Sequence, residues 1–232
     1  MKIRIKFKKT GIMRYIGHLD VMRYFQKVNR RAGVDIAYSA GFSPHQLMSF
    51  ASPLGLGLTS EGEYLDMEVH SCESSRSMAE RMNAVMAEGM EIVGVWQLPE
   101  GAKPAMAVVA AADYVLTPEQ ELWGEIRGTA ETFFAQSAIP VRKKTKKSEK
   151  EVDIRPLIYD WRLLDGGIFV KLASGSTDNL KPELILEAFF RYMGREYDPC
   201  SCSVCRMELY AREGGEAEGR LIPLSDFGEE IL

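Results

Sequence analysis

Three cysteines close to the C-terminal end of the sequence have the residue type and spacing that could bind a metal ion. Cys200, Cys202 and Cys205 form a C-x-C-x-x-C pattern. Three thiolates can hold a zinc ion or an iron–sulfur cluster if a fourth ligand comes from elsewhere, for instance from Cys72 or from a partner. The sequence therefore predicts a zinc or iron–sulfur site here, and incidental surface thiols are the alternative.

The histidines are the residues that could carry out acid–base catalysis. The sequence contains three, His18, His45 and His70, and no two of them stand at a spacing typical of a zinc enzyme. His18 or His45, together with a hydroxyl group and a nearby lysine, could cleave RNA by general acid–base catalysis. Helix capping and loop packing are the alternative roles. The catalytic residues therefore stay unknown, with these two as candidates.

Basic residues are concentrated in two segments, although the net charge of the chain is −4. Residues 1–33 contain ten Lys or Arg and one acid, Asp20, and the second segment reads RKKTKK at 142–147. Crowded like charges are relieved by a phosphate backbone or by an acidic surface. The sequence predicts an anion-binding surface, and ordinary solvated residues of a helix and a loop are the alternative. Its members are Arg23, Lys27, Arg30, Arg31, Arg142, Lys143, Lys144, Lys146 and Lys147.

A strand and a helix position the first of these basic segments. Apolar residues alternate with Lys2, Arg4, Lys6 and Lys8, which predicts a strand with one buried and one basic face. We expect outward-facing residues of a neighbouring strand at 64–68 to pair with these cations. From residue 18 to 32, apolar residues recur at helical spacing and leave the other cations on the opposite face. The helix is therefore the better candidate for binding.

The order of elements predicts an α+β fold. Strands at 2–8, 34–38, 63–69 and 91–98, with helices after the first and third, give the ferredoxin-like split βαβ arrangement with an antiparallel sheet. After a Pro/Gly stretch the pattern begins again, although a final strand is not evident. We predict tandem ferredoxin-like domains at 1–100 and 105–195, followed by a Cys-containing acidic tail at 196–232. No apolar run is long enough to span a membrane and no secretory signal is visible, so we expect a cytoplasmic protein.

Several motifs, taken in order, resemble a known family. They are RIKFKKTG at 4–11, MRY at 13–15, HLD at 18–20, RRAG at 30–33, AYSAGFSPH at 37–45, SEGEY at 60–64 and KEVDIRPLI at 150–158. Together they resemble the radical SAM-linked protein family, a domain of unknown function found beside or fused to radical SAM proteins. Gly17 and Gln46-Leu47 depart from the family pattern. The resemblance implies a radical SAM protein as partner and brings no catalytic residue.

The sequence thus favours an accessory protein that works with a radical SAM enzyme and binds RNA or another anionic substrate through its basic residues. Independent catalytic activity is not expected. Two alternatives stay open: a metal-independent endoribonuclease-like enzyme that uses His18 or His45, and an adaptor whose basic helix binds an acidic protein.

Overall fold

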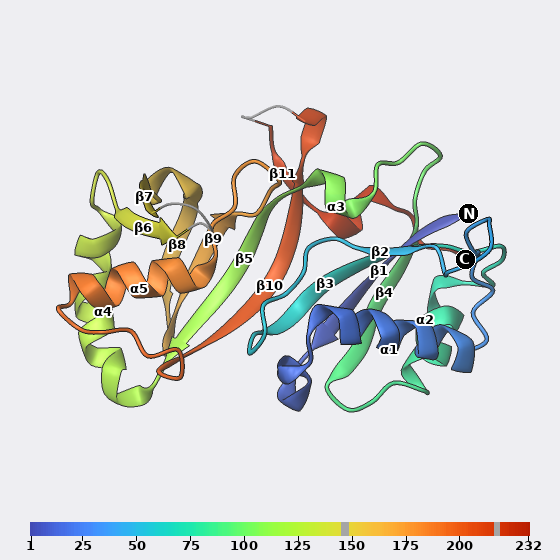
Figure 1. Ribbon diagram of the computed structural model, residues 1–232, viewed down its shortest axis with the longest axis horizontal. Coiled ribbons are helices and arrows are strands. Elements are labelled where there is room, and N and C mark those ends of the chain that lie inside the picture. The colour runs from blue at the N-terminus through green and yellow to red at the C-terminus, as the bar shows by residue number, and fades with distance from the viewer. Residues whose placement is uncertain (145–148, 216–218) are drawn as a thin grey trace. The chain divides into compact units, whose positions relative to one another are not determined.

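The computed structural model describes residues 1–144, 149–215 and 219–232, and it has the predicted α+β class (Figure 1). The chain forms two compact units. Unit 1 contains Met1–Val109 together with Arg206–Leu232, and unit 2 contains Ala110–Cys205. In the part of the chain that the structure describes, no helix is long and apolar enough to cross a membrane.

The sheet of unit 1 is centred on β1, which pairs antiparallel with β3 on one side and with β4 on the other. The short strand β2 pairs antiparallel with β3, and β11 pairs antiparallel with β10. The bounds are β1 (Lys2–Lys9), β2 (Met48–Phe50), β3 (Thr59–Glu68), β4 (Met90–Gln97), β10 (Cys202–Arg212) and β11 (Leu221–Pro223). The helices are η1 (Gly11–Tyr15), α1 (His18–Arg31), α2 (Ser75–Asn83), α3 (Ala105–Val108), η3 (Glu213–Gly215) and η4 (Leu224–Phe227).

The core of unit 1 confirms the two periodicities read from the sequence. Ile3, Ile5 and Phe7 of β1 are buried because they share the face of the strand that the helices cover. On α1 the apolar stripe packs against them, and the ring of Phe25 lies 4.7 Å from the ring of Phe7. Met78 of α2 completes the same cluster.

One predicted strand of this unit is wrong. Residues 34–38 form only isolated bridges, such as Ile36 with Val69, whereas the second strand is β2, further along the chain. A short strand of three residues carries almost no alternation from which it could be recognised.

In unit 2, β9 pairs antiparallel with β5 on one side and with β8 on the other. The two main helices of this unit share a core in which the ring of Phe133 stacks on Phe189 at 4.6 Å and that of Phe134 stacks on Trp161 at 4.5 Å. A separate ribbon pairs β6 with β7. The elements are β5 (Val109–Pro118), α4 (Gln120–Phe134), β6 (Pro140–Lys144), β7 (Glu149–Asp153), η2 (Arg155–Leu157), β8 (Ile158–Leu164), β9 (Gly167–Ala173) and α5 (Pro182–Tyr192).

Residues 196–232, for which the sequence predicts a separate tail, contribute the strands β10 and β11. The division between the units falls within β10, with Cys205 in unit 2 and Arg206 in unit 1. The buried positions of this strand alternate from Cys202 to Arg206, shift by one residue and continue at Leu209 and Ala211. Arg206 occupies one of them, and its charge hides the apolar periodicity.

Candidate functional site

The four cations on the outer face of β1 all have acidic partners in unit 1. Arg4 forms a bidentate pair with Asp66, with Nε–Oδ1 and Nη2–Oδ2 distances of 2.7 and 3.0 Å. Lys2 lies 3.7 Å from Glu68, which stands opposite it in the register of β1 and β3. Both pairs confirm the cross-strand neutralisation that the sequence predicts.

The other two cations of this face find partners that the sequence did not indicate. Lys6 Nζ lies 2.5 Å from Glu208 of β10, whose other oxygen accepts a hydrogen bond of 2.6 Å from the Tyr64 hydroxyl. Lys8 contacts Glu61 at 3.2 Å and Glu91 at 3.4 Å. The basic face of β1 is therefore neutralised by the protein itself.

The cations of α1 have a different environment. Arg23, Lys27, Arg30 and Arg31 are exposed and, at this spacing, lie along one side of the helix. Arg23 makes a solvent-exposed contact of 3.4 Å with Asp20, which is the one acidic partner of these four within the described residues. An exposed pair of this kind contributes only about 0.2–1 kcal/mol. The helix thus presents positive charge that the protein leaves largely uncompensated.

A loop beside this helix carries exposed aromatic rings. Tyr38 and Gln46 form an antiparallel bridge that closes the loop, and we call residues 38–46 the aromatic loop. The Phe42 side chain is fully exposed and that of Tyr38 is 49% exposed. Ser39 and His45 hold the loop closed, because the Ser39 hydroxyl lies 2.8 Å from His45 Nδ1 and accepts a hydrogen bond from the His45 backbone amide.

Hydrogen bonds attach the aromatic loop to the basic side of α1. The buried side chain of Gln46 accepts from Asn29 at 3.0 Å and donates to the carbonyl oxygen of Gln26 at 3.3 Å. Arg30 Nε donates to the same carbonyl oxygen, also at 3.3 Å. The base of the loop and the guanidinium group of Arg30 are therefore neighbours. From the sequence, Gln46 looked only like a departure from a family pattern, so this contact was missed.

The second predicted basic segment belongs to the ribbon of unit 2. Arg142 is exposed and stands opposite Glu151 in the register of β6 and β7, a position at which opposite charges attract. Lys143 and Lys144 are in β6, but only their backbone is described, and Lys146 and Lys147 lie outside the described residues. The candidate interface is therefore built from α1 and the aromatic loop.

The two candidate catalytic histidines have packing and loop-closing contacts. The His18 ring packs edge-on against the Phe50 ring, with 5.3 Å between centroids. His18 also lines a cavity of about 20 Å³ together with Lys9 and Glu63. His45 bonds to Ser39 within the aromatic loop. These are the packing and loop roles that the sequence left open as alternatives.

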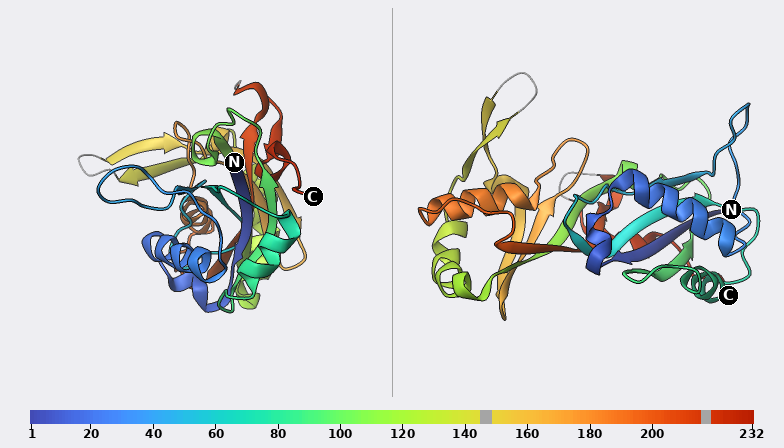
Figure 2. Two further views of the ribbon diagram at one scale, coloured as in Figure 1. Left: turned by 90° about the vertical axis from the view of Figure 1, so that its right-hand side faces the viewer. Right: turned by 60° about the horizontal axis from the view of Figure 1, so that its bottom comes forward.

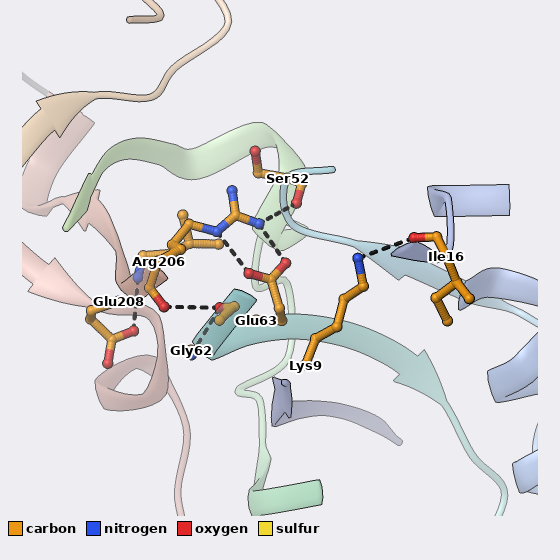
Figure 3. A network of polar contacts seen from close by, with 9 residues as sticks. Lys9, Ile16, Ser52, Gly62, Glu63, Arg206 and Glu208 are labelled. Carbon is orange, nitrogen blue, oxygen red and sulfur yellow. Dashed lines mark hydrogen bonds and ion pairs between the residues drawn. The ribbon is translucent and has the colours of Figure 1, made fainter. Parts of the chain in front are cut away.

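A buried ionic network lies beneath the start of α1 (Figure 3). Arg206 donates from Nε to Glu63 Oε1 at 2.7 Å, from Nη2 to Glu63 Oε2, and from Nη2 to the carbonyl oxygen of Ser52 at 2.9 Å. Lys9 Nζ donates to the carbonyl oxygen of Ile16 at 3.1 Å. Burial lowers the pKa of Lys9, and the Glu63 carboxylate opposes that shift. The network fixes β1, β3, β10 and the segment that leads into α1.

In the described part of the chain, the cysteines of the predicted metal site are not gathered around one point. Cys200 is exposed, Cys202 is buried, and Cys205, three residues further along β10, belongs to the opposite face of the strand. Burial, followed by the nearby Glu119 carboxylate, raises the pKa of Cys202 to about 12. Among the described residues, no group of three or more Cys, His, Asp or Glu side chains is placed to hold a metal ion.

Comparison with known proteins gives one family match. Residues 2–182 match the model of a family described as an uncharacterized protein conserved in bacteria (DUF2344). The matched range contains α1 and the aromatic loop and ends before the cysteines of β10. No curated protein matches the chain.

Proposed function

We infer that this chain, which belongs to the DUF2344 family of uncharacterized proteins conserved in bacteria, is a binding protein that presents RNA to a partner enzyme. The observation that carries this inference is the contrast between two sets of cations in unit 1. The cations of β1 all have acidic partners, whereas α1 keeps Lys27, Arg30 and Arg31 exposed and without an acidic partner among the described residues.

Uncompensated positive charge on one side of a helix is suited to bind a polyanion. Each cation that contacts a phosphate releases a condensed counterion, and this release supplies much of the affinity. The exposed rings of the aromatic loop, whose base lies beside Arg30, favour RNA over an acidic protein, because an acidic protein surface offers no flat bases for them to stack on. Binding rather than cleavage is supported, since His18 and His45 are engaged in packing and loop closure.

We propose a radical SAM enzyme as the partner. This proposal rests on the resemblance of the ordered motifs, among them RIKFKKTG at 4–11 and AYSAGFSPH at 37–45, to the radical SAM-linked protein family. An enzyme of that kind would carry the reactive cofactor, and this chain would hold the substrate. The sequence predicts that the protein resides in the cytoplasm, which contains both RNA and enzymes of this kind.

We further propose that each unit is a ferredoxin-like domain. In unit 1 the strands lie in the order β4-β1-β3-β2, and in unit 2 in the order β10-β5-β9-β8. In both, a helix follows the first strand and another follows the third. This is the chain order of the split βαβ motif, with the first strand in the middle of the sheet.

The salt dependence of RNA binding tests the proposed function. We expect a fluorescent single-stranded RNA to bind the protein with an affinity that falls steeply with KCl concentration. The triple variant Arg23→Ala/Lys27→Ala/Arg30→Ala should bind more weakly, and the slope of log affinity against log salt should become shallower by about 2, since three phosphate contacts are lost. Fluorescence anisotropy at several salt concentrations measures both quantities.

A matched control removes the same charge elsewhere. Arg76→Ala/Arg127→Ala/Arg191→Ala removes three exposed cations from α2, α4 and α5 and should leave the slope nearly unchanged. An equal loss in both triple variants would show that binding follows net charge and not α1. If the wild-type protein has no affinity for RNA at low salt, the proposed function is wrong and an adaptor for an acidic protein becomes the better hypothesis.

A further inference from the structure

We propose that the aromatic loop stacks on unpaired bases, so that the surface selects single-stranded over double-stranded RNA. This inference rests on the proposed function and names its substrate more narrowly. It is carried by two exposed rings, Phe42 and Tyr38, of a loop whose base lies beside Arg30 of α1.

The exposure of Phe42 is the first observation. Its side chain extends fully into solvent at the outer end of the loop, and Figure 2 shows the segment between α1 and β2 extending away from the strands of unit 1. An exposed phenyl ring adds no hydrophobic stabilisation to the folded chain, because none of its apolar surface is removed from water. A partner that covers the ring would be stabilised by burying this apolar area. A nucleobase has a flat face that fits the ring.

The second observation is that the loop is closed before any ligand binds. Besides the contacts of the Ser39 hydroxyl, the Ser39 amide donates to the His45 carbonyl oxygen at 2.9 Å. The Leu47 amide donates to the Ala37 carbonyl oxygen at 2.9 Å, which continues the pairing below the bridge of Tyr38 and Gln46. A loop ordered in this way presents its rings at a lower cost in conformational entropy on binding.

The third observation is the position of the rings relative to positive charge. Gln46 Nε2 lies 3.4 Å from the Tyr38 hydroxyl and 3.3 Å from the Gln26 carbonyl oxygen, to which Arg30 also donates. Tyr38 and Arg30 are therefore linked through one side chain and one carbonyl group. Phosphates bound along α1 would bring adjacent bases to the loop, which is the combination of charged track and stacking ring that binds single strands.

Stacking requires an accessible base face, whereas phosphate contacts do not. In an A-form duplex the bases are paired and stacked on each other, so their faces are closed to a protein side chain. The cations of α1 could contact the backbone of either form. Preference for a single strand must therefore come from the aromatic loop.

The test compares Phe42→Ala and Phe42→Trp with the wild-type protein, each titrated with one RNA sequence in single-stranded and in double-stranded form. Phe42→Ala should weaken binding of the single strand between about 5-fold and 150-fold, leave duplex binding unchanged and leave the salt slope unchanged, because no charge is removed. Phe42→Trp should restore the affinity. A single strand that carries 2-aminopurine should lose fluorescence on binding wild type and not on binding Phe42→Ala.

Leu56→Ala is the matched control, because Leu56 is an exposed apolar side chain of unit 1 outside the aromatic loop. It should bind as wild type does. If Phe42→Ala binds the single strand as tightly as wild type, the stacking proposal is overturned, while a steep salt slope that depends on α1 would still uphold the proposed function. If wild type binds neither form, both proposals fall together.

Discussion

Arg206 and Glu63 face each other inside unit 1, and their side chains are only 2% and 6% exposed. In such a place an arginine is tolerated because its fork matches the carboxylate and its Nη2 also donates to the Ser52 carbonyl oxygen. The arginines of α1 are chemically the same but lie in solvent with little compensation. At the scale of the residue, the partner decides whether a cation supports the fold or is available to a ligand.

Glu63→Gln should be one of the most destabilising single substitutions in unit 1. It leaves the buried charge of Arg206 without its counterion, which costs about 3–5 kcal/mol in the free energy of unfolding. The double variant Glu63→Met/Arg206→Met should lose less than the sum of the two single variants, because both charges leave together. Urea unfolding followed by circular dichroism measures these differences.

The matched control is the exposed pair of Arg76 and Glu80 on α2. Arg76→Met should leave the free energy of unfolding nearly unchanged, because both side chains of this pair are exposed to solvent. A loss as large as that of Glu63→Gln would mean that burial is not what distinguishes the two pairs.

At the scale of the element, the approach of β10 to β3 depends on a glycine. A Cβ atom at Gly62 would lie 2.4 Å from the carbonyl oxygen of Met207 and 3.1 Å from the Cα of Glu208. Both neighbours are backbone, which cannot move aside as a flexible side chain could. The same stretch of β10 carries Arg206 and Glu208. The close approach of β10 to β3 therefore sets the positions of the Arg206 guanidinium group, which donates hydrogen bonds, and of the Glu208 carboxylate, which accepts them (Figure 3).

Gly62→Ala should therefore destabilise unit 1 by about 1–3 kcal/mol through overpacking against the β10 backbone. Gly124→Ala should have the opposite effect and stabilise the protein by up to about 1 kcal/mol, because Gly124 is exposed within α4 and nothing lies within 4 Å of the added atom. Thermal unfolding of the two variants checks the signs. Equal behaviour of both would contradict the role given to Gly62.

At the scale of the whole molecule, the C-terminal residues belong to the fold. Leu209, Ala211 and Leu224 are buried in unit 1, and the carbonyl oxygen of Leu224 accepts a hydrogen bond of 3.0 Å from Arg4. Unit 1 is thus assembled from two segments of the chain that are separated by all of unit 2. The contacts of β10 with the first segment of unit 1 are therefore non-local, because a loop that contains all of unit 2 must close before they form.

A chain that ends at Cys205 should lose the order of unit 1, while β8 and β9 of unit 2, which pair with each other and not with β10, should keep theirs. Without residues 206–232, Glu63 is buried without Arg206, and the edge of β3 that β10 occupies is open. In hydrogen exchange read by mass spectrometry, peptides from β1 and β3 should lose protection, while those from β8 and β9 keep it. Full protection of β1 and β3 would instead support the separate tail that the sequence predicts.

Local periodicity was enough to predict many of the elements. The alternation of Ile3, Ile5 and Phe7 and the stripe of Val21, Phe25 and Val28 identified β1 and α1 because each pattern repeats within a few residues. The predicted pairing of Lys2 and Arg4 across the sheet followed from the same alternation. The α+β class and the exposed cations of α1 were also evident at this level.

By itself the sequence determined which residues form the main strands and helices, and which face of α1 is positive. Only the tertiary structure decided which cations are neutralised, because their partners stand far away in the chain: Glu208 is 202 residues from Lys6, and Glu63 is 143 residues from Arg206. The same holds for the aromatic loop, whose residue Gln46 shares the Gln26 carbonyl oxygen with Arg30. Pairing of this kind leaves no local periodicity, since it depends on how distant segments pack.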